Sequence, residues 1–296
     1  MTTRTSYWRT FALPGVGWLL LFVVVPAYAV IAMAMGRVNI LLQPIPAWNP
    51  ATWNPGYVWK AFSGALPGGE YWPAVRNTIL YVGASLALCF AIGYPVAYYV
   101  ARHAKKTKAL LIVLLVIPFW VSYLLRMLAW IGLLSSDGYV NKLLMDLGIT
   151  HPPDWLNGNP YSVIVALVYG YIPYFILPVF AGLDRIDASQ IEAARDLGAT
   201  PWQAFRRVTL PLSRPFILAG AALVVLPMFG DYYTNDLISA SPRTNMLGNQ
   251  INLFVQGGSE KNLGASLVLV LMAILAVGMA YYLYQTARDT RALRTA

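Results

Sequence analysis

The chain has 296 residues, of which 58% are hydrophobic and only 11% are charged. This composition excludes an ordinary soluble domain and indicates a protein that crosses a membrane several times. The net charge of +9 does not indicate nucleic-acid binding, because the basic residues stand in short groups between apolar runs.

Groups that could support chemistry are scarce. Cys89 is the only cysteine and lies in an apolar run, and the only histidines are His103 and His151. We therefore expect neither a disulfide framework nor a metal site. The sequence lacks a Gly-Lys dipeptide, and hence a Walker A motif, and contains no GxSxG or HExxH motif. We expect no enzymatic activity and no cofactor on this chain.

The N-terminal segment predicts a first membrane span. Arg4 and Arg9 precede an apolar run from Phe11 to Met35, and the pattern resembles a secretory signal with small residues at Ala27 and Ala29. The run of about 25 residues exceeds the roughly 7–15 of a signal's apolar region. We therefore favour an uncleaved helix over a cleaved signal.

Six apolar stretches are long enough to cross the hydrocarbon core, which takes about 20 residues. They are Leu13–Met35, Thr78–Ala101, Ala109–Leu134, Ser162–Phe180, Phe216–Ile238 and Ala265–Tyr284. The fifth is the least regular because Pro227, Gly230, Asp231 and Asp236 interrupt it. The sequence predicts an all-α integral membrane protein with six transmembrane helices.

The distribution of Lys and Arg predicts the orientation. Fourteen lie on the face of the termini: Arg4, Arg9, Arg102, Lys105, Lys106, Lys108, Arg185, Arg195, Arg206, Arg207, Arg214, Arg288, Arg291 and Arg294. Six lie on the other face: Arg37, Lys60, Arg76, Lys142, Arg243 and Lys261. Cytoplasmic loops carry the excess of basic residues, so we expect both termini and the loop between the fourth and fifth spans in the cytoplasm.

These spans divide the chain into consecutive regions. They are a cytoplasmic tail (1–12), the first span with a long outer loop (13–77), a transmembrane core (78–285) containing the cytoplasmic loop 184–215, and a second cytoplasmic tail (286–296). The outer loop carries Trp48, Trp53, Trp59 and Trp72. It suits either docking of an extracytoplasmic partner or a segment anchored at the membrane interface by tryptophans.

The cytoplasmic loop predicts two short helices. Asp187, followed three residues later by Gln190, starts the first helix over residues 188–197, and Gly198 is placed to end it. Thr200 and Gln203 form a capping pair for the second helix, with Pro201 at its first position.

The second short helix is expected to stop at Leu210-Pro211. Apolar side chains beside charged ones predict a compact surface of the kind found at protein interfaces. Those apolar residues are Ile191, Leu197, Trp202 and Phe205.

The segment EAARDLGATPWQAFRRVTLP (192–211) resembles the EAA loop of type I ABC importer permeases, which share a MetI-like transmembrane domain. The defining positions of that motif are matched by Glu192, Ala193, Ala194, Gly198, Leu210 and Pro211. The resemblance implies that the loop inserts into a cleft of a cytoplasmic ATPase and, with Phe205, couples nucleotide-driven closure to the spans. The alternative is an amphipathic hairpin lying on lipid headgroups.

Three further stretches resemble the permeases of spermidine/putrescine importers. They are PFWVSYLLRMLAW (118–130), GYIPYFILPVFAGLDRID (170–187) and GDYYTNDLISASPRTNMLGNQI (230–251). The resemblance implies polyamine transport. Permeases for other small solutes share parts of these strings, so a quaternary amine, an opine-like compound or a sugar stays open as the substrate.

A polycation that crosses an apolar bundle needs acceptors and aromatic faces. Asp231, Tyr232, Tyr233, Asn235 and Asp236 offer both near the outer end of the fifth span. On a continuous helix Asp231 and Asn235 share a face, whereas Asp236 is rotated away from Asp231 by about 140°. The alternative is that these carboxylates are simply hydrated at the interface.

Arg126 is the only basic residue within a span. Charge inside a membrane is a candidate functional feature. Arg126 lies about 24 Å along its span, close enough to the outer surface to snorkel or to form a salt bridge there. A role in the substrate pathway is the second interpretation.

The resemblance also implies the partners. They are a dimer of a cytoplasmic ABC ATPase that holds ATP and Mg²⁺, a second permease that is related but not identical, an extracytoplasmic substrate-binding protein and membrane lipid, with no nucleic acid. The location that the resemblance implies is a bacterial inner membrane. An ion-coupled secondary transporter is the competing class, but the sequence shows neither an inverted repeat nor charges at the membrane midplane.

Overall fold

The computed structural model describes residues 4–40, 43–104, 106–257 and 260–295, and the side chains within Phe11–Gln285 of these ranges. Several residues used to predict the orientation lie outside the described residues or side chains. They are Lys105, Arg4, Arg9, Arg288, Arg291 and Arg294.

The chain forms two compact units, residues 1–72 with 250–274, and residues 73–249 with 275–296. The sequence-based regions, with boundaries at 77 and 285, do not separate residues 250–274 in this way. The first unit contains α1 (Arg4–Ala34), β1 (Arg37–Val38), β2 (Pro44–Ile45), η1 (Pro50–Thr52) and α2 (Gly56–Ala65). Two helices, α12 (Leu247–Gln256) and α13 (Lys261–Thr295), pass from one unit into the other.

The segment that follows α1 in the first unit folds locally. Strands β1 and β2 pair antiparallel, with Arg37 opposite Ile45. A β-carbon on Gly36 would lie 2.2 Å from the Ile45 carbonyl oxygen, so the hairpin base admits only glycine. The Asn262 amide donates a hydrogen bond to the Met33 carbonyl (2.7 Å), which ties the start of α13 to the end of α1.

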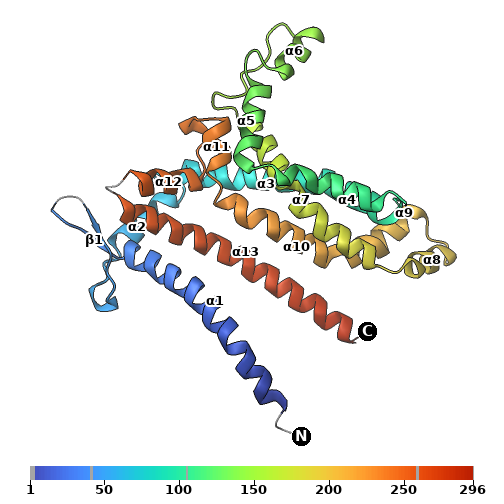
Figure 1. Cartoon of the computed structure of the whole chain (residues 1–296), viewed down its shortest axis with the longest axis horizontal. Helices are drawn as coiled ribbons and strands as arrows, with labels where there is room; N and C mark the ends of the chain where they lie inside the picture. The colour runs from blue at the N-terminus through green and yellow to red at the C-terminus, as the bar shows by residue number, and fades with distance from the viewer. Residues whose placement is uncertain (1–3, 41–42, 105, 258–259, 296) are drawn as a thin grey trace. The chain divides into compact units, whose positions relative to one another are not determined.

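The second unit is a helical bundle. Its elements are α3 (Trp72–Arg102), α4 (Lys108–Val116), η2 (Ile117–Trp120), α5 (Tyr123–Leu134), α6 (Tyr139–Asp146), α7 (Pro160–Arg185), α8 (Ala188–Asp196), α9 (Pro201–Ala204), the π-helical turn η3 (Phe205–Thr209), α10 (Leu210–Phe229), α11 (Tyr233–Ile238) and η4 (Pro242–Thr244). Within this unit α3, α7 and α10 run side by side, with α8 and α9 at one end and α11 at the other (Figure 1).

Five of the six predicted spans contain a described helix long and apolar enough to cross a membrane, but the third and the fifth predicted spans are not single helices. Five described helices are long and apolar enough to span a membrane: 11–34, 72–102, 160–185, 201–229 and 261–285. The third predicted span, Ala109–Leu134, is instead a pair of helical segments, 108–120 and 123–146, bent by 89°. Extended backbone at Val121 and Ser122 makes the break, just after Pro118 in the preceding 3₁₀ turn.

The fifth predicted span, Phe216–Ile238, is also interrupted. Helix α10 ends at Phe229, and α11 starts at Tyr233. Residues Gly230, Asp231 and Tyr232 connect them, so Asp231 lies between two helices rather than on the face of one.

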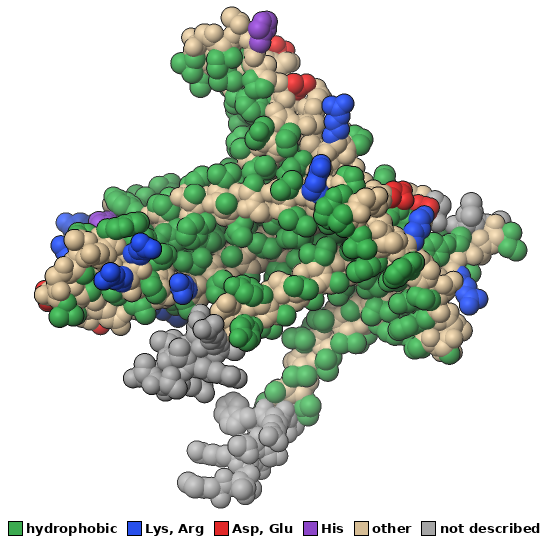
Figure 2. Space-filling view, turned by 180° about the vertical axis from the view of Figure 1, so that it is seen from behind, with side chains coloured by type: hydrophobic (Ala, Val, Ile, Leu, Met, Phe, Trp, Pro, Cys, Tyr) green, Lys and Arg blue, Asp and Glu red, His purple; other side chains and the backbone are tan. Residues whose placement is uncertain are grey.

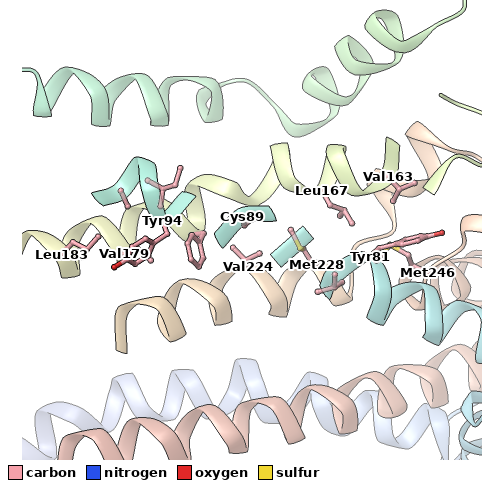
Figure 3. Packing of buried hydrophobic residues seen from close by; sticks show 14 of the residues in the cluster. Tyr81, Cys89, Tyr94, Val163, Leu167, Val179, Leu183, Val224, Met228 and Met246 are labelled. Atoms are coloured by element: carbon pink, nitrogen blue, oxygen red, sulfur yellow. The ribbon is translucent and has the colours of Figure 1, made fainter. Parts of the chain in front are cut away.

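The core of the second unit lies between α3, α7 and α10. Tyr81, Cys89 and Tyr94 of α3 meet Leu167 and Val179 of α7 there, and Val224 and Met228 of α10 complete the cluster (Figure 3). Helices α7 and α10 approach closely at Gly182, where a β-carbon would lie 1.9 Å from Cγ of Phe216. The small side chain at residue 182 thus allows the phenylalanine ring to pack onto α7.

We expect Gly182→Ala to destabilise the bundle by roughly 1–3 kcal/mol, because the added methyl group overpacks this contact. Gly83→Ala in α3 is the matched control, since a β-carbon there meets nothing within 4 Å. Thermal unfolding of the purified protein in detergent should show a lower Tm for Gly182→Ala alone. Equal Tm values for the two variants would contradict the packing described.

Candidate functional site

The loop after α7 begins with a capped helix. The Asp187 carboxylate accepts a hydrogen bond from the Ser189 backbone N–H at 3.0 Å, as an N-cap does. That bond holds the pKa of the Asp187 carboxyl below its ordinary value. The predicted start of this helix is confirmed, and its end falls at Asp196, one residue earlier than predicted.

Gly198 ends α8 in a Schellman motif. The Gly198 N–H donates to the Arg195 carbonyl (2.9 Å), and the Ala199 N–H donates to the Ala194 carbonyl (3.1 Å). This arrangement requires the left-handed region, and Gly198 has φ +86. The prediction that Gly198 provides the bend is confirmed.

The second helix starts as predicted, but it does not stop at Pro211. Thr200 and Gln203 form the predicted capping box around Pro201. The helix then continues through the π turn 205–209 into α10, so residues 201–229 form one helical span. A wider π turn just before Pro211 accommodates the missing N–H and the proline ring without ending the helix.

The side chains of this loop divide into outward and inward groups. Leu197 is 89% exposed and Trp202 is 66% exposed, as an interface surface requires. Phe205, which was predicted to belong to this interface surface, is instead half-buried, with its ring centroid 5.7 Å from that of Tyr98 and 6.0 Å from that of Tyr94. The Phe205 ring therefore packs α3 against the start of the 201–229 helix.

The other residues of the motif lie on the same short segment. Glu192 and Ala193 are exposed on α8, Ala194 is half-buried, and Leu210 and Pro211 are half-buried at the start of α10. Ala194, Leu197 and Gly198 line a shallow hollow with Gln203 and Arg207. Figure 2 shows Lys and Arg gathered at the end of the bundle that carries α8 and α9, while apolar side chains cover its middle. This end combines an apolar hollow with a basic rim.

An ion pair braces the same end of the bundle. Lys108 at the start of α4 pairs with Asp184 near the end of α7. It is the only salt bridge among the described residues. Both side chains are partly exposed, so its contribution to stability is small.

The second candidate region is a buried carboxylate between α10 and α11. Asp231 is 8% exposed and accepts hydrogen bonds from the Thr234 N–H (2.9 Å), the Thr234 hydroxyl (2.6 Å), the Tyr171 hydroxyl (3.0 Å) and the Tyr123 hydroxyl (3.4 Å). The alternative that this carboxylate is simply hydrated is therefore wrong. Helices α5, α7 and α11 meet at its two oxygens.

The remaining predicted pathway residues do not join Asp231. Asn235 is buried and its amide donates to Asn249 (3.3 Å), while Asp236 is exposed and accepts from Asn249 (2.7 Å). The rings of Tyr232 and Tyr233 lie against each other with centroids 4.5 Å apart. Asp231 and Asn235 do not share a helical face, because the helix is broken between α10 and α11.

Arg126 lies in an aromatic box made by Phe119, Tyr123 and Tyr169. Its Cζ atom is 4.4, 5.3 and 5.9 Å from their ring centroids, in that order. The side chain is only 9% exposed and forms no salt bridge within the described part of the chain. The predicted salt bridge of Arg126 is thus absent among the described residues, and its snorkelling to the membrane surface stays a prediction.

Sequence analysis missed Tyr123, Tyr171, Thr234 and Asn249, which hold the polar groups around the α10–α11 break. Tyr123 and Tyr171 stand in the quoted motifs PFWVSYLLRMLAW and GYIPYFILPVFAGLDRID. The feature that could have identified both tyrosines is a polar hydroxyl group within an apolar span, because such a group needs a hydrogen-bond partner when it is buried. No local sequence pattern identifies Asp231 as the hydrogen-bond acceptor for these hydroxyl groups.

The chain belongs to the family of binding-protein-dependent transport system inner membrane components, whose model matches residues 90–293. It is thus a permease subunit of an ABC importer.

Relatives with this role match most of the chain. The spermidine/putrescine transport system permease protein PotB of Salmonella typhimurium is 30% identical over 286 residues, which are 95% of this chain and 94% of the relative. The protein of the same name from Escherichia coli is 35% identical over 199 residues, 67% of this chain and 72% of the relative.

Solved transporters share the fold. One chain of a bacterial ABC transporter involved in the import of the acidic polysaccharide alginate has a TM-score of 0.71, with 18% identity and 96% of both chains covered. The methionine transporter MetNI, in an inward-facing conformation, gives 0.54, with 21% identity and 77% of this chain and 99% of that chain covered.

We expect Gly198→Val to leave membrane insertion intact and to abolish uptake by the assembled importer. A valine at φ +86 costs roughly 1–2 kcal/mol or more in backbone strain and would redirect the chain between the two loop helices. Gly198→Asn is the matched control, because asparagine adopts the left-handed region more readily. Immunoblots of membranes and vesicle uptake measure the two effects. Normal transport by the valine variant would contradict a role for this bend.

Proposed function

We propose that this permease imports polyamines of the spermidine and putrescine class. The observation that carries this proposal is the similarity to spermidine/putrescine permeases over 95% of the chain. The buried Asp231, with the tyrosines around it, supports the proposal, because a polycation needs carboxylate and aromatic partners inside an apolar bundle.

The loop 184–215 would dock to a separate ATPase that holds ATP and Mg²⁺. Leu197 and Trp202 present apolar contacts, and Glu192 offers a charged one. Because α9, the π turn and α10 form one continuous helical segment (201–229), a displacement of α9 would be passed along α10 toward the α10–α11 break. The helix thus links the ATPase contact to the candidate substrate region.

The assembled importer would contain further partners. A second permease, related but not identical, would complete the pathway within the lipid bilayer, and an extracytoplasmic binding protein would deliver the substrate. The loop would face the cytoplasm, as the excess of basic residues on that side favours.

The test is ATP-dependent uptake of radiolabelled spermidine and putrescine into vesicles that contain the assembled complex and its binding protein. We expect saturable uptake that sugars and amino acids do not compete for. Uptake that persists without ATP while ion gradients are maintained would instead indicate a secondary transporter.

Asp231→Asn should raise the KM for the polyamine, because the amide keeps the shape of the carboxylate but removes its charge. Asp236→Asn is the control on the exposed neighbouring carboxylate.

The substrate itself has a separate outcome. If polyamine uptake is absent and the ATPase activity is stimulated by a binding protein loaded with a quaternary amine, an opine-like compound or a sugar, that compound is the substrate instead.

A further inference from the structure

The three walls of the aromatic box are held in place by contacts outside it. Phe119 packs edge-to-face on Tyr174 with ring centroids 5.7 Å apart, and Tyr169 packs in the same way on Trp130 at 5.4 Å. The third wall, Tyr123, is fixed by hydrogen bonds from its hydroxyl group to Asp231 and with Thr234. The box is therefore preorganised, independently of the cation inside it.

The cation inside the box is poorly matched to it. Arg126 Nε and Nη1 are buried, and neither has a hydrogen-bond partner among the described residues. A guanidinium group is suited to oxygen acceptors that bind it in a bidentate manner, and leaving its N–H groups buried without acceptors is costly. Three aromatic faces, by contrast, are a usual receptor for a quaternary ammonium group, which has no N–H, and a primary ammonium has three N–H donors where a guanidinium has five.

The box adjoins the buried carboxylate. Tyr123 contributes its ring to the box, and its hydroxyl group donates to Asp231. One side chain, that of Tyr123, therefore separates a cation in the box from the Asp231 carboxylate. Both helix breaks of the second unit also meet here, since Tyr123 follows the 89° bend and Asp231 lies between α10 and α11. Discontinuous helices of this kind form substrate sites in membrane transporters.

We propose that the aromatic box is a subsite for an organic ammonium group, and that Arg126 occupies it until a substrate ammonium takes its place beside Asp231. The inference rests on the proposed function in one respect, namely that the substrate is an organic cation. Arg126 keeps the buried carboxylate and the aromatic faces compensated while the site is empty, and a substrate that displaces it restores the same charge balance.

The test uses the full complex of both permeases and the ATPase in nanodiscs, without the binding protein. Equilibrium dialysis measures the binding of spermidine and, separately, of tetramethylammonium. We expect Arg126→Gln to bind both cations roughly tenfold more tightly than the wild type, because the tethered competitor is gone. Arg126→Lys, which keeps a tethered cation and makes it an alkylammonium, should bind them no more tightly than the wild type does.

A second substitution in the Arg126→Gln background identifies the site. Phe119→Leu removes the nearest wall and should abolish the gain, whereas Trp120→Leu should not, because Trp120 is 80% exposed and lies outside the box. Equal affinities of Arg126→Gln and Arg126→Lys, or a gain that survives Phe119→Leu, would overturn the proposal.

If the complex with Arg126→Gln does not assemble, the proposal is tested with Phe119→Leu and Trp120→Leu in the wild-type background. Phe119→Leu should then raise the KM for spermidine uptake about tenfold, with Trp120→Leu unchanged, and equal KM values would overturn the proposal. If the importer does not transport polyamines, the proposed function fails on its own. The tetramethylammonium affinity of Phe119→Leu against that of the wild type then tests the box separately.

Discussion

The structure depends on one constraint, which is that backbone N–H and C=O groups inside a membrane need partners within the protein. The second unit interrupts its helices between α10 and α11 and again before α12, and side chains bind backbone groups that these interruptions leave free. Asp231 accepts the Thr234 N–H, Asn249 donates to the Tyr232 carbonyl and accepts the Met246 N–H, and Thr78 accepts the Leu247 N–H. Asn77 donates to the carbonyls of Arg243 and Asn245. The buried polar residues of this unit are thus concentrated where the helices stop.

The α10–α11 break depends on a few side-chain hydrogen bonds. A segment that relies on a few side-chain hydrogen bonds rearranges more easily than a continuous helix, because fewer bonds are exchanged. The unbroken 201–229 helix lies between the exposed loop and the α10–α11 break. In the proposed coupling, a displacement of the loop would reach the α10–α11 break along this continuous helical segment.

The loop 184–215 shows which structural features a local sequence pattern can predict and which it cannot. Its caps at Asp187 and Thr200 and its glycine bend at Gly198 were predictable, because each is decided by hydrogen bonds to backbone groups two to five residues away. The role of Pro211 was predicted wrongly, since a proline that lacks an N–H usually ends a helix. The π turn that precedes it depends on packing against α3 and α7, through Phe205 and its neighbours, which no local pattern encodes.

The sequence by itself determined the membrane class, the number of apolar stretches, the capped loop and the family, because composition, span length and short motifs depend only on neighbouring residues. Only the tertiary structure decided that the third and fifth stretches are broken, that Asp231 is buried under Tyr123 and Tyr171, and that Arg126 is enclosed by aromatic rings. These features join residues as far apart as 123 and 231, and such pairings are selected by packing and by the need to satisfy buried polar groups.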